Sequence, residues 1–101
     1  MNIQKMMQQA QKMQRDMAKI QSELETKSYQ ATKTGMVSVE VNGKFEVTSV
    51  KIEEELLSPE YKEELETAML LVMTEAMQKA NDDKEKTMGQ LTNGMNIPGL
   101  F

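Results

Sequence analysis

The chain has 101 residues, 39% of them hydrophobic, and a formal net charge of −4, so its length predicts one domain with a single modest core. It contains no cysteine and no histidine, which excludes a disulfide framework and removes the commonest metal ligand and the usual acid–base group. We therefore expect no enzyme, no metal, no cofactor and no small-molecule substrate. The longest apolar run, Ala68 to Met73, is too short to cross a membrane and no signal peptide opens the chain, so we expect a cytoplasmic protein.

The first predicted element is a long helix from about Asn2 to about Thr26. Apolar residues recur along it at steps of three and four and form one stripe; they are Ile3, Met6, Ala10, Met13, Met17, Ile20 and Leu24. Four cations project about 150° away from this stripe; they are Lys5, Lys12, Arg15 and Lys19.

This pattern has two interpretations. A packed surface helix or a short coiled coil has the same spacing, with the charges merely solvated. The polar positions, however, hold more glutamine than carboxylate, and residues 1–28 carry five cations against three anions. The cationic face of the helix can therefore hold an anion such as the phosphates of DNA, with the glutamines adding a weak base preference.

A small antiparallel sheet is predicted next. Residues 28–34 shift the composition toward strand and turn formers, and Val37, Val39 and Val41 then alternate with polar residues, which is the pattern of a half-buried strand. Asn42-Gly43 predicts a two-residue hairpin turn, in which the glycine adopts a positive φ.

The returning strand is predicted from Lys44 to about Glu53. Val50 and Ile52 fall out of phase with Phe45 and Val47, which indicates either a bulge near Thr48-Ser49 or a strand covered on both faces. A dimer would supply the second cover.

A second long helix is predicted from Ser58 as the N-cap, with Pro59 at the first helical position. Its broad apolar face continues to Ala80 and resumes at Met88, and Thr92-Asn93-Gly94 ends it. The fold class is thus α+β, with one domain over residues 1–94 and a short apolar tail at 95–101 that we expect to be mobile. Three lysines near the end of this helix suit its dipole and are candidates for a secondary DNA contact; they are Lys79, Lys84 and Lys86.

The acidity of the chain is confined to residues 53–75, which carry a net charge of −7. Glu53-Glu54-Glu55 is the densest group of carboxylates, but consecutive side chains at a strand end diverge and do not form a site. At a Debye length of about 8 Å, an acidic patch on the far side leaves the basic helix face available to DNA.

Several segments, in this order and spacing, resemble the YbaB/EbfC nucleoid-associated proteins of bacteria; they are residues 6–14 (MMQQAQKMQ), 35–44 (GMVSVEVNGK), 50–52 (VKI), 88–91 (MGQL) and 98–101 (PGLF). The resemblance implies a homodimer of helix–sheet–helix protomers with protruding helices arranged like tweezers. It also implies DNA binding that compacts or reshapes the duplex, and no enzyme activity. Relatives often carry a run of glycines where this chain has Thr34-Gly35-Met36, so the loop is expected to be stiffer here.

We therefore predict a dimeric protein of the cytoplasm and nucleoid that binds double-stranded DNA mainly through phosphate contacts, an activity that can influence gene expression. The predicted DNA-binding residues are Lys5, Lys12, Arg15 and Lys19, and the predicted dimer or packing residues are Val37, Val39, Val41, Val50 and Ile52. The alternative is a protein-interaction module, in which the Met-rich helix docks in a partner's groove and has no nucleic-acid role.

Overall fold

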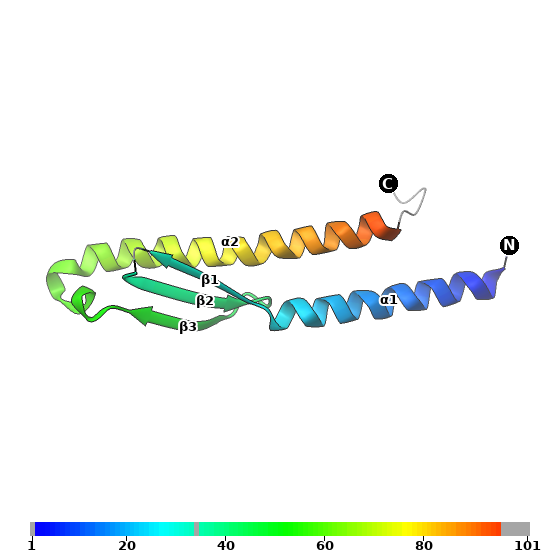
Figure 1. The fold of residues 1–101 in the computed structure, drawn as a ribbon, viewed down its shortest axis with the longest axis horizontal. Helices are drawn as coiled ribbons and strands as arrows, with labels where there is room; N and C mark the ends of the chain where they lie inside the picture. Colours follow the sequence, from blue (N-terminus) through cyan, green and yellow to red (C-terminus); the bar gives the residue numbers. More distant parts are fainter. Residues whose placement is uncertain (1, 34, 96–101) are drawn as a thin grey trace.

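The computed structural model describes residues 2–33 and 35–95 and has the predicted α+β order of helix, strands, helix. The elements are α1 (Ile3–Thr26), β1 (Ser28–Lys33), β2 (Val37–Asn42), β3 (Val47–Ile52), two short 3-10 turns (Glu54–Leu57 and Pro59–Tyr61) and α2 (Lys62–Met95). The strands form one antiparallel sheet in the order β1-β2-β3. In Figure 1, α2 runs along the sheet and, together with α1, extends beyond it toward the end that holds both termini. The molecule is accordingly long, with extents of 72 × 23 × 15 Å.

β1 is the strand that the sequence pattern did not reveal. It pairs with β2 from Ser28 opposite Asn42 to Lys33 opposite Val37. Only Tyr29 and Ala31 on this strand pack at the core, and Ala31 is buried. Two apolar residues, one of them as small as alanine, give too weak an alternation to mark a strand.

β3 contains the predicted bulge. Val41 lies opposite Val47 and Glu40 lies opposite Ser49, so Thr48 is the extra residue on β3. The extra residue restores the alternation of apolar and polar side chains, because Val47, Val50 and Ile52 then lie on the same face of the sheet as the β2 valines opposite them. Of the two interpretations of the out-of-phase pattern, the bulge is confirmed.

The turn between β2 and β3 differs from the prediction. The Phe45 amide donates to the Asn42 carbonyl at 3.0 Å, the Asn42 amide donates to the Glu46 carbonyl at 3.0 Å, and Phe45 itself has φ 63°. This is a three-residue loop, a β-turn followed by a left-handed residue, and β3 consequently begins at Val47 rather than Lys44. The two-residue turn with a positive φ at Gly43 was wrong, since among the described glycines only Gly35 has a positive φ.

The core lies between α2 and the strands β1 and β2. Its helix side is formed by residues four apart, namely Ala68, Val72, Ala76 and Ala80, whose small side chains let the helix approach the sheet closely. Its sheet side includes Val37, Val39 and Val41, which are at most 1% exposed. The prediction grouped these valines as dimer or packing residues, and the structure places them in the protomer's own core.

β3 remains uncovered by α2. Val50 is 44% exposed and Val47 is 39% exposed, while Ile52 is half-buried and packs against the core. The apolar face of β3, next to the buried face of β2, is therefore available to pack against another surface.

α2 begins and ends close to the predicted positions. Pro59 occupies the first position of the 3-10 turn that leads into Lys62, although the Ser58 side chain makes no capping bond. The helix continues unbroken past Asn81 and ends at Met95, one residue beyond Gly94. Apart from Met95, the predicted tail lies outside the described residues.

Candidate nucleic-acid interface

α1 is an arm that projects from the sheet. Its 24 residues correspond to a length of about 36 Å at 1.5 Å per residue. The Asn2 side chain accepts a hydrogen bond from the Lys5 amide at 3.4 Å and caps the helix start. Within α1 only Leu24, near the end that joins the sheet, is buried, and Ile3 near the tip is 71% exposed. Most of the arm is therefore accessible from every side, its apolar stripe included.

The four predicted DNA-binding residues stand along this arm. Lys5, Lys12, Arg15 and Lys19 are all exposed, and in the part of the chain that the structure describes no ion pair involves them. Cations without a carboxylate partner remain available to bind phosphate oxygens. The structure thus places all four on one projecting helix, as the helical spacing predicted.

The three lysines predicted for a secondary DNA contact have partners within the protomer. Lys79 Nζ donates to the Gln30 carbonyl of β1 at 2.7 Å and lies 3.8 Å from Glu75. Lys84 Nζ lies 5.5 Å from the centre of the Phe45 ring, within the range of a cation–π interaction. Lys86 is exposed and acts electrostatically on Asp83. A secondary DNA contact by these residues stays a prediction.

Charge is segregated along the long axis of the molecule. The acidic residues 53–75 occupy the turn after β3 and the first part of α2, at the end of the molecule opposite to the termini (Figure 1). The cations of α1 lie toward the other end. Because the molecule is many Debye lengths long, the acidic end hardly weakens the field around the arm.

A polar cluster ties α2 to the start of the sheet, where sequence reasoning named no site. The Tyr29 hydroxyl donates to Asp83 Oδ2 at 2.5 Å, and Lys27 Nζ donates to the same oxygen at 3.1 Å. Burial and the Asp83 carboxylate raise the pKa of Tyr29 to about 12. The hydrogen bonds from Tyr29 and Lys27 lower the pKa of Asp83. No sequence pattern signals this cluster, because Asp83 lies more than 50 residues from both Lys27 and Tyr29.

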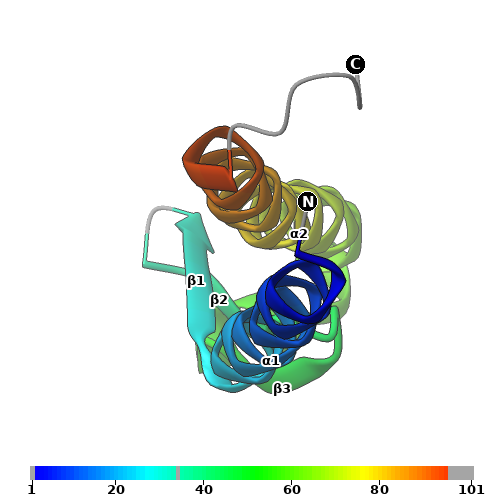
Figure 2. The same cartoon turned by 90° about the vertical axis from the view of Figure 1, so that its right-hand side faces the viewer.

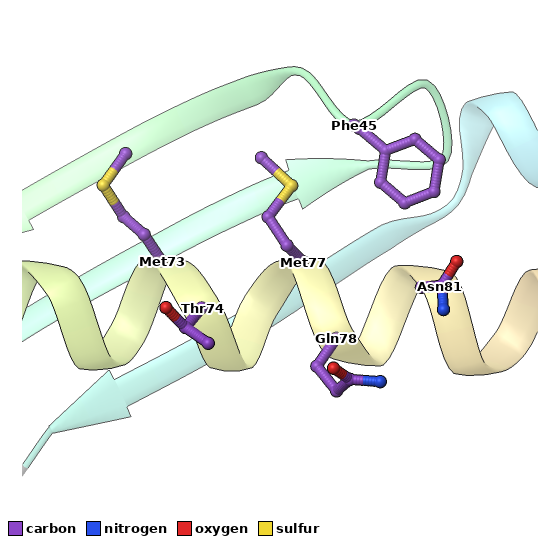
Figure 3. A pocket seen from close by; sticks show the side chains of 6 residues that line it. All are labelled: Phe45, Met73, Thr74, Met77, Gln78 and Asn81. Atoms are coloured by element: carbon purple, nitrogen blue, oxygen red, sulfur yellow. The ribbon is translucent and has the colours of Figure 1, made fainter.

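An apolar groove lies beside the hairpin loop. It has a volume of about 470 Å³ and is lined by Phe45, Met73, Thr74, Met77, Gln78 and Asn81. Figure 3 shows Met73 and Met77 projecting from successive turns of α2 on the side where the hairpin and Phe45 lie. Together with the exposed Val47 and Val50 of β3, the groove forms an apolar surface beside α2.

The described residues offer no metal centre, because among them no three metal-ligating side chains gather. None of the helices in the described ranges is long and apolar enough to cross a membrane.

Comparisons with known proteins agree with this architecture. A nucleoid-associated protein of Alkaliphilus metalliredigens is 46% identical over 101 residues, which cover 99% of this chain and 89% of the relative. A nucleoid-associated protein of Pelotomaculum thermopropionicum is 44% identical, with coverage of 99% and 96%. The crystal structure of an uncharacterized Helicobacter pylori protein superimposes with a TM-score of 0.78 at 17% identity, covering 91% of this chain and 98% of that one, which shows the shared fold.

The sequence profile of the YbaB/EbfC DNA-binding family matches residues 1–95. This match covers α1, the sheet and α2 entirely, and the family is defined by DNA binding rather than by catalysis. The chain therefore belongs to the YbaB/EbfC DNA-binding family.

Proposed function

We propose that this protein binds double-stranded DNA through the cationic face of α1, mainly by contacts to phosphates. The observation that carries the proposal is the set of four exposed cations on a projecting helix, none in an ion pair with a described residue. Membership of a DNA-binding family and the nucleoid-associated relatives support it.

The spacing of these cations suits a duplex. Lys5 and Lys19 are 14 residues apart, or about 21 Å along the helix axis. That distance corresponds to about six base pairs at 3.4 Å each. Gln8 stands among the cations on the same face by its helical spacing and adds an amide that can reach a base edge.

We further propose that two copies associate through the apolar surface of β3, Val47 and Val50, together with the groove beside Phe45. Leu70 of α2, one helical turn before Thr74 of the groove lining, is also exposed and extends the apolar area available to a second copy. A symmetric dimer presents two α1 arms at once. Two arms on one duplex, or on two neighbouring segments, reshape or compact the DNA without any need for base-specific contacts.

The experiment that tests the DNA contact is a binding titration over a range of salt concentrations. If half to all of the eight α1 cations of a dimer meet phosphates, the slope of log affinity against log salt is about −4 to −7. Changing Lys12→Glu and Lys19→Glu together is expected to cut affinity about tenfold or more on unrelated sequences and to flatten the slope.

The matched control places the same charge change on the sheet, as Lys44→Glu with Lys51→Glu. Both of these lysines are exposed; Lys51 lies on β3, and Lys44 lies in the hairpin loop beside the last turn of α1, far along the helix from Lys5 and Lys12. If the sheet variant loses DNA binding while the α1 variant keeps it, the proposed contact surface is wrong.

A protein-interaction module is the second candidate, because the apolar stripe of α1 stays exposed at Ile3, Met6 and Met17. Such a stripe can dock in a groove of another protein. In that case the double change at Lys12 and Lys19 leaves DNA affinity unchanged, and DNA binding by the parent protein lacks the steep salt dependence.

A further inference from the structure

α1 is linked to the sheet through one residue, and its last turn also lies against the hairpin loop at Gly43. The helix ends at Thr26, Lys27 is extended with φ −71° and ψ 152°, and β1 begins at Ser28. The Lys27 amide donates to the Leu24 carbonyl at 3.2 Å and closes the last turn. One residue thus separates the arm from the sheet, and the direction of the arm depends on what holds that residue.

Small rotations at this point move the arm a long way. A turn of 10° at Lys27 displaces the tip of a helix of about 36 Å by about 6 Å, which approaches two base-pair steps. The placement of the α1 cations on DNA therefore requires a fixed angle at the junction.

Packing between the helices does not fix this angle. An open groove of about 420 Å³ lies between the end of α1, the hairpin loop and α2; its lining is Gln21, Leu24 and Glu25 from α1, Gly43, Lys44 and Phe45 from the loop, and Lys84 and Met88 from α2. Figure 2 shows the molecule along its long axis, with the α1 and α2 ribbons partly overlapping in that view, and Figure 1 shows both helices extending beyond the sheet. Since Leu24 is the one buried residue of α1, side-chain packing restrains the arm only at its last turn.

Asp83 holds the linking residue and the start of β1 at the same time. Its Oδ2 accepts a hydrogen bond from Lys27, the linking residue, and another from Tyr29, the second residue of β1. The Asp83 side chain is 27% exposed; its bond from Tyr29 is partly buried, and its bond from Lys27 is exposed. Hydrogen bonds to a charged acceptor are stronger than neutral ones, and these two join the C-cap residue of α1 and the second residue of β1 to α2.

We infer that Asp83 is a positioning residue which, through Lys27 and Tyr29, sets the direction of the α1 arm relative to α2. The inference rests on the proposed function, because it names what presents the α1 cations to DNA. Its physical basis is the Asp83 carboxylate oxygen that accepts hydrogen bonds from both Lys27 and Tyr29. The inference does not require Asp83 to contact DNA.

The test measures the arm directly. The chain has no cysteine, so spin labels are attached at Gln9→Cys on α1 and Gln90→Cys on α2, both exposed positions. Diluting labelled with unlabelled protein restricts the measured distances to pairs within one protomer. Asp83→Ala is compared with Asp82→Ala, which removes the same charge one residue away and loses only a surface bond from Gln78.

We expect one narrow distance peak in the parent protein and in Asp82→Ala, and a loss of that single peak in Asp83→Ala. Tyr29→Phe, which removes one donor and no charge, is expected to broaden the peak less, and it serves as the test if Asp83→Ala does not fold. DNA affinity is expected to fall about threefold to tenfold in Asp83→Ala, because a disordered arm must be ordered on binding.

Superimposable distance distributions for the parent protein and Asp83→Ala, or for the parent and Tyr29→Phe should Asp83→Ala fail to fold, would overturn the inference. If the distribution broadens while DNA affinity is unchanged, Asp83 positions the arm as inferred and the proposed contact of α1 with DNA is wrong. The two ideas therefore fail separately.

Discussion

Position 43 requires glycine because the backbone of Leu24 lies close to it, not because of its backbone angles. A Cβ at this position would lie 1.7 Å from the Leu24 carbonyl oxygen. The oxygen is a backbone atom, and the position of the Cβ is fixed by the Gly43 backbone. Neither can move aside without shifting the end of α1 or the hairpin loop. The glycine is thus part of the joint between arm and sheet.

Gly43→Ala is expected to lower the free energy of unfolding by about 2–3 kcal/mol, as overpacking does in a crowded site. Urea unfolding measures the change. Gly35→Ala is the control for backbone strain alone, since Gly35 has φ +71° but no heavy atom within 4 Å of an added Cβ. Equal effects of the two substitutions would show that the close approach at Leu24 is not the reason for the glycine.

Tyr29 gives a pH-dependent signal of its own. The chain has two tyrosines and no tryptophan, so absorbance near 295 nm follows the two phenols alone. The Tyr29 step is expected with a pKa of about 12, and Asp83→Asn should shift it downward, because the carboxylate charge that disfavours the phenolate is gone. A Tyr29 step that stays in place in Asp83→Asn would contradict the assigned cause.

The sign of the effect on stability follows from the direction of each shift. Since the raised pKa favours the neutral Tyr29 phenol in the folded state, its contribution is complete below the ordinary pKa of about 10 and is lost as pH rises toward 12. The lowered pKa of Asp83 affects folding stability at acidic pH. Its contribution is present above the ordinary carboxyl pKa and is lost as pH falls through the lower folded value.

At the scale of elements, strong periodicity made both helices predictable. The predicted bounds of α1 match within a residue; α2 was predicted from Pro59 to about Gly94 and runs from Lys62 to Met95, because residues 59–61 form a 3-10 turn. The bulge in β3 was also visible, because a single extra residue shifts the phase of every apolar position after it.

The rest of the fold depended on long-range contacts. β1 is held by its pairing with β2 and by Lys79 of α2 on the Gln30 carbonyl, neither of which leaves a local pattern. The hairpin loop has its left-handed residue at Phe45, where steric rules favour glycine or asparagine. Of the candidate site, the helical positions of the cations were predictable and the Asp83 cluster was not, because it joins segments distant in sequence.

Within α2, Gly89 offers a way to stabilise the helix without touching the core. An added Cβ at Gly89 meets no heavy atom within 4 Å, and glycine in a helix interior costs about 1 kcal/mol relative to alanine. Gly89→Ala is therefore expected to raise the unfolding free energy by about 0.5–1 kcal/mol, measured by urea unfolding. An unchanged or lower stability would indicate that Gly89 meets a second copy of the chain.

At the scale of the whole molecule, the apolar surface of β3 sets the expected oligomeric state. Val47→Glu with Val50→Glu should convert a dimer to a monomer, because charges in the centre of an apolar contact are costly to bury. The protomer should remain folded, since both valines are 39% or more exposed within it. Sedimentation equilibrium and circular dichroism measure the two properties.

The control is Thr32→Glu, an exposed position of β1 that pairs with Ser38 on the opposite, polar face of the sheet. This variant should remain a dimer. Loss of the dimer in Thr32→Glu, with the double valine variant still dimeric, would move the interface to the other face.

The separation of acidic residues 53–75 from the α1 cations, at opposite ends of a molecule 72 Å long, makes the protomer an electric dipole. The field of a duplex exerts a torque on such a dipole and turns the arm toward the phosphates before contact. Salt should then slow association more than it speeds dissociation. In the proposed complex each molecule would point its acidic end away from the DNA, so the outer surface of a coated duplex would stay negative.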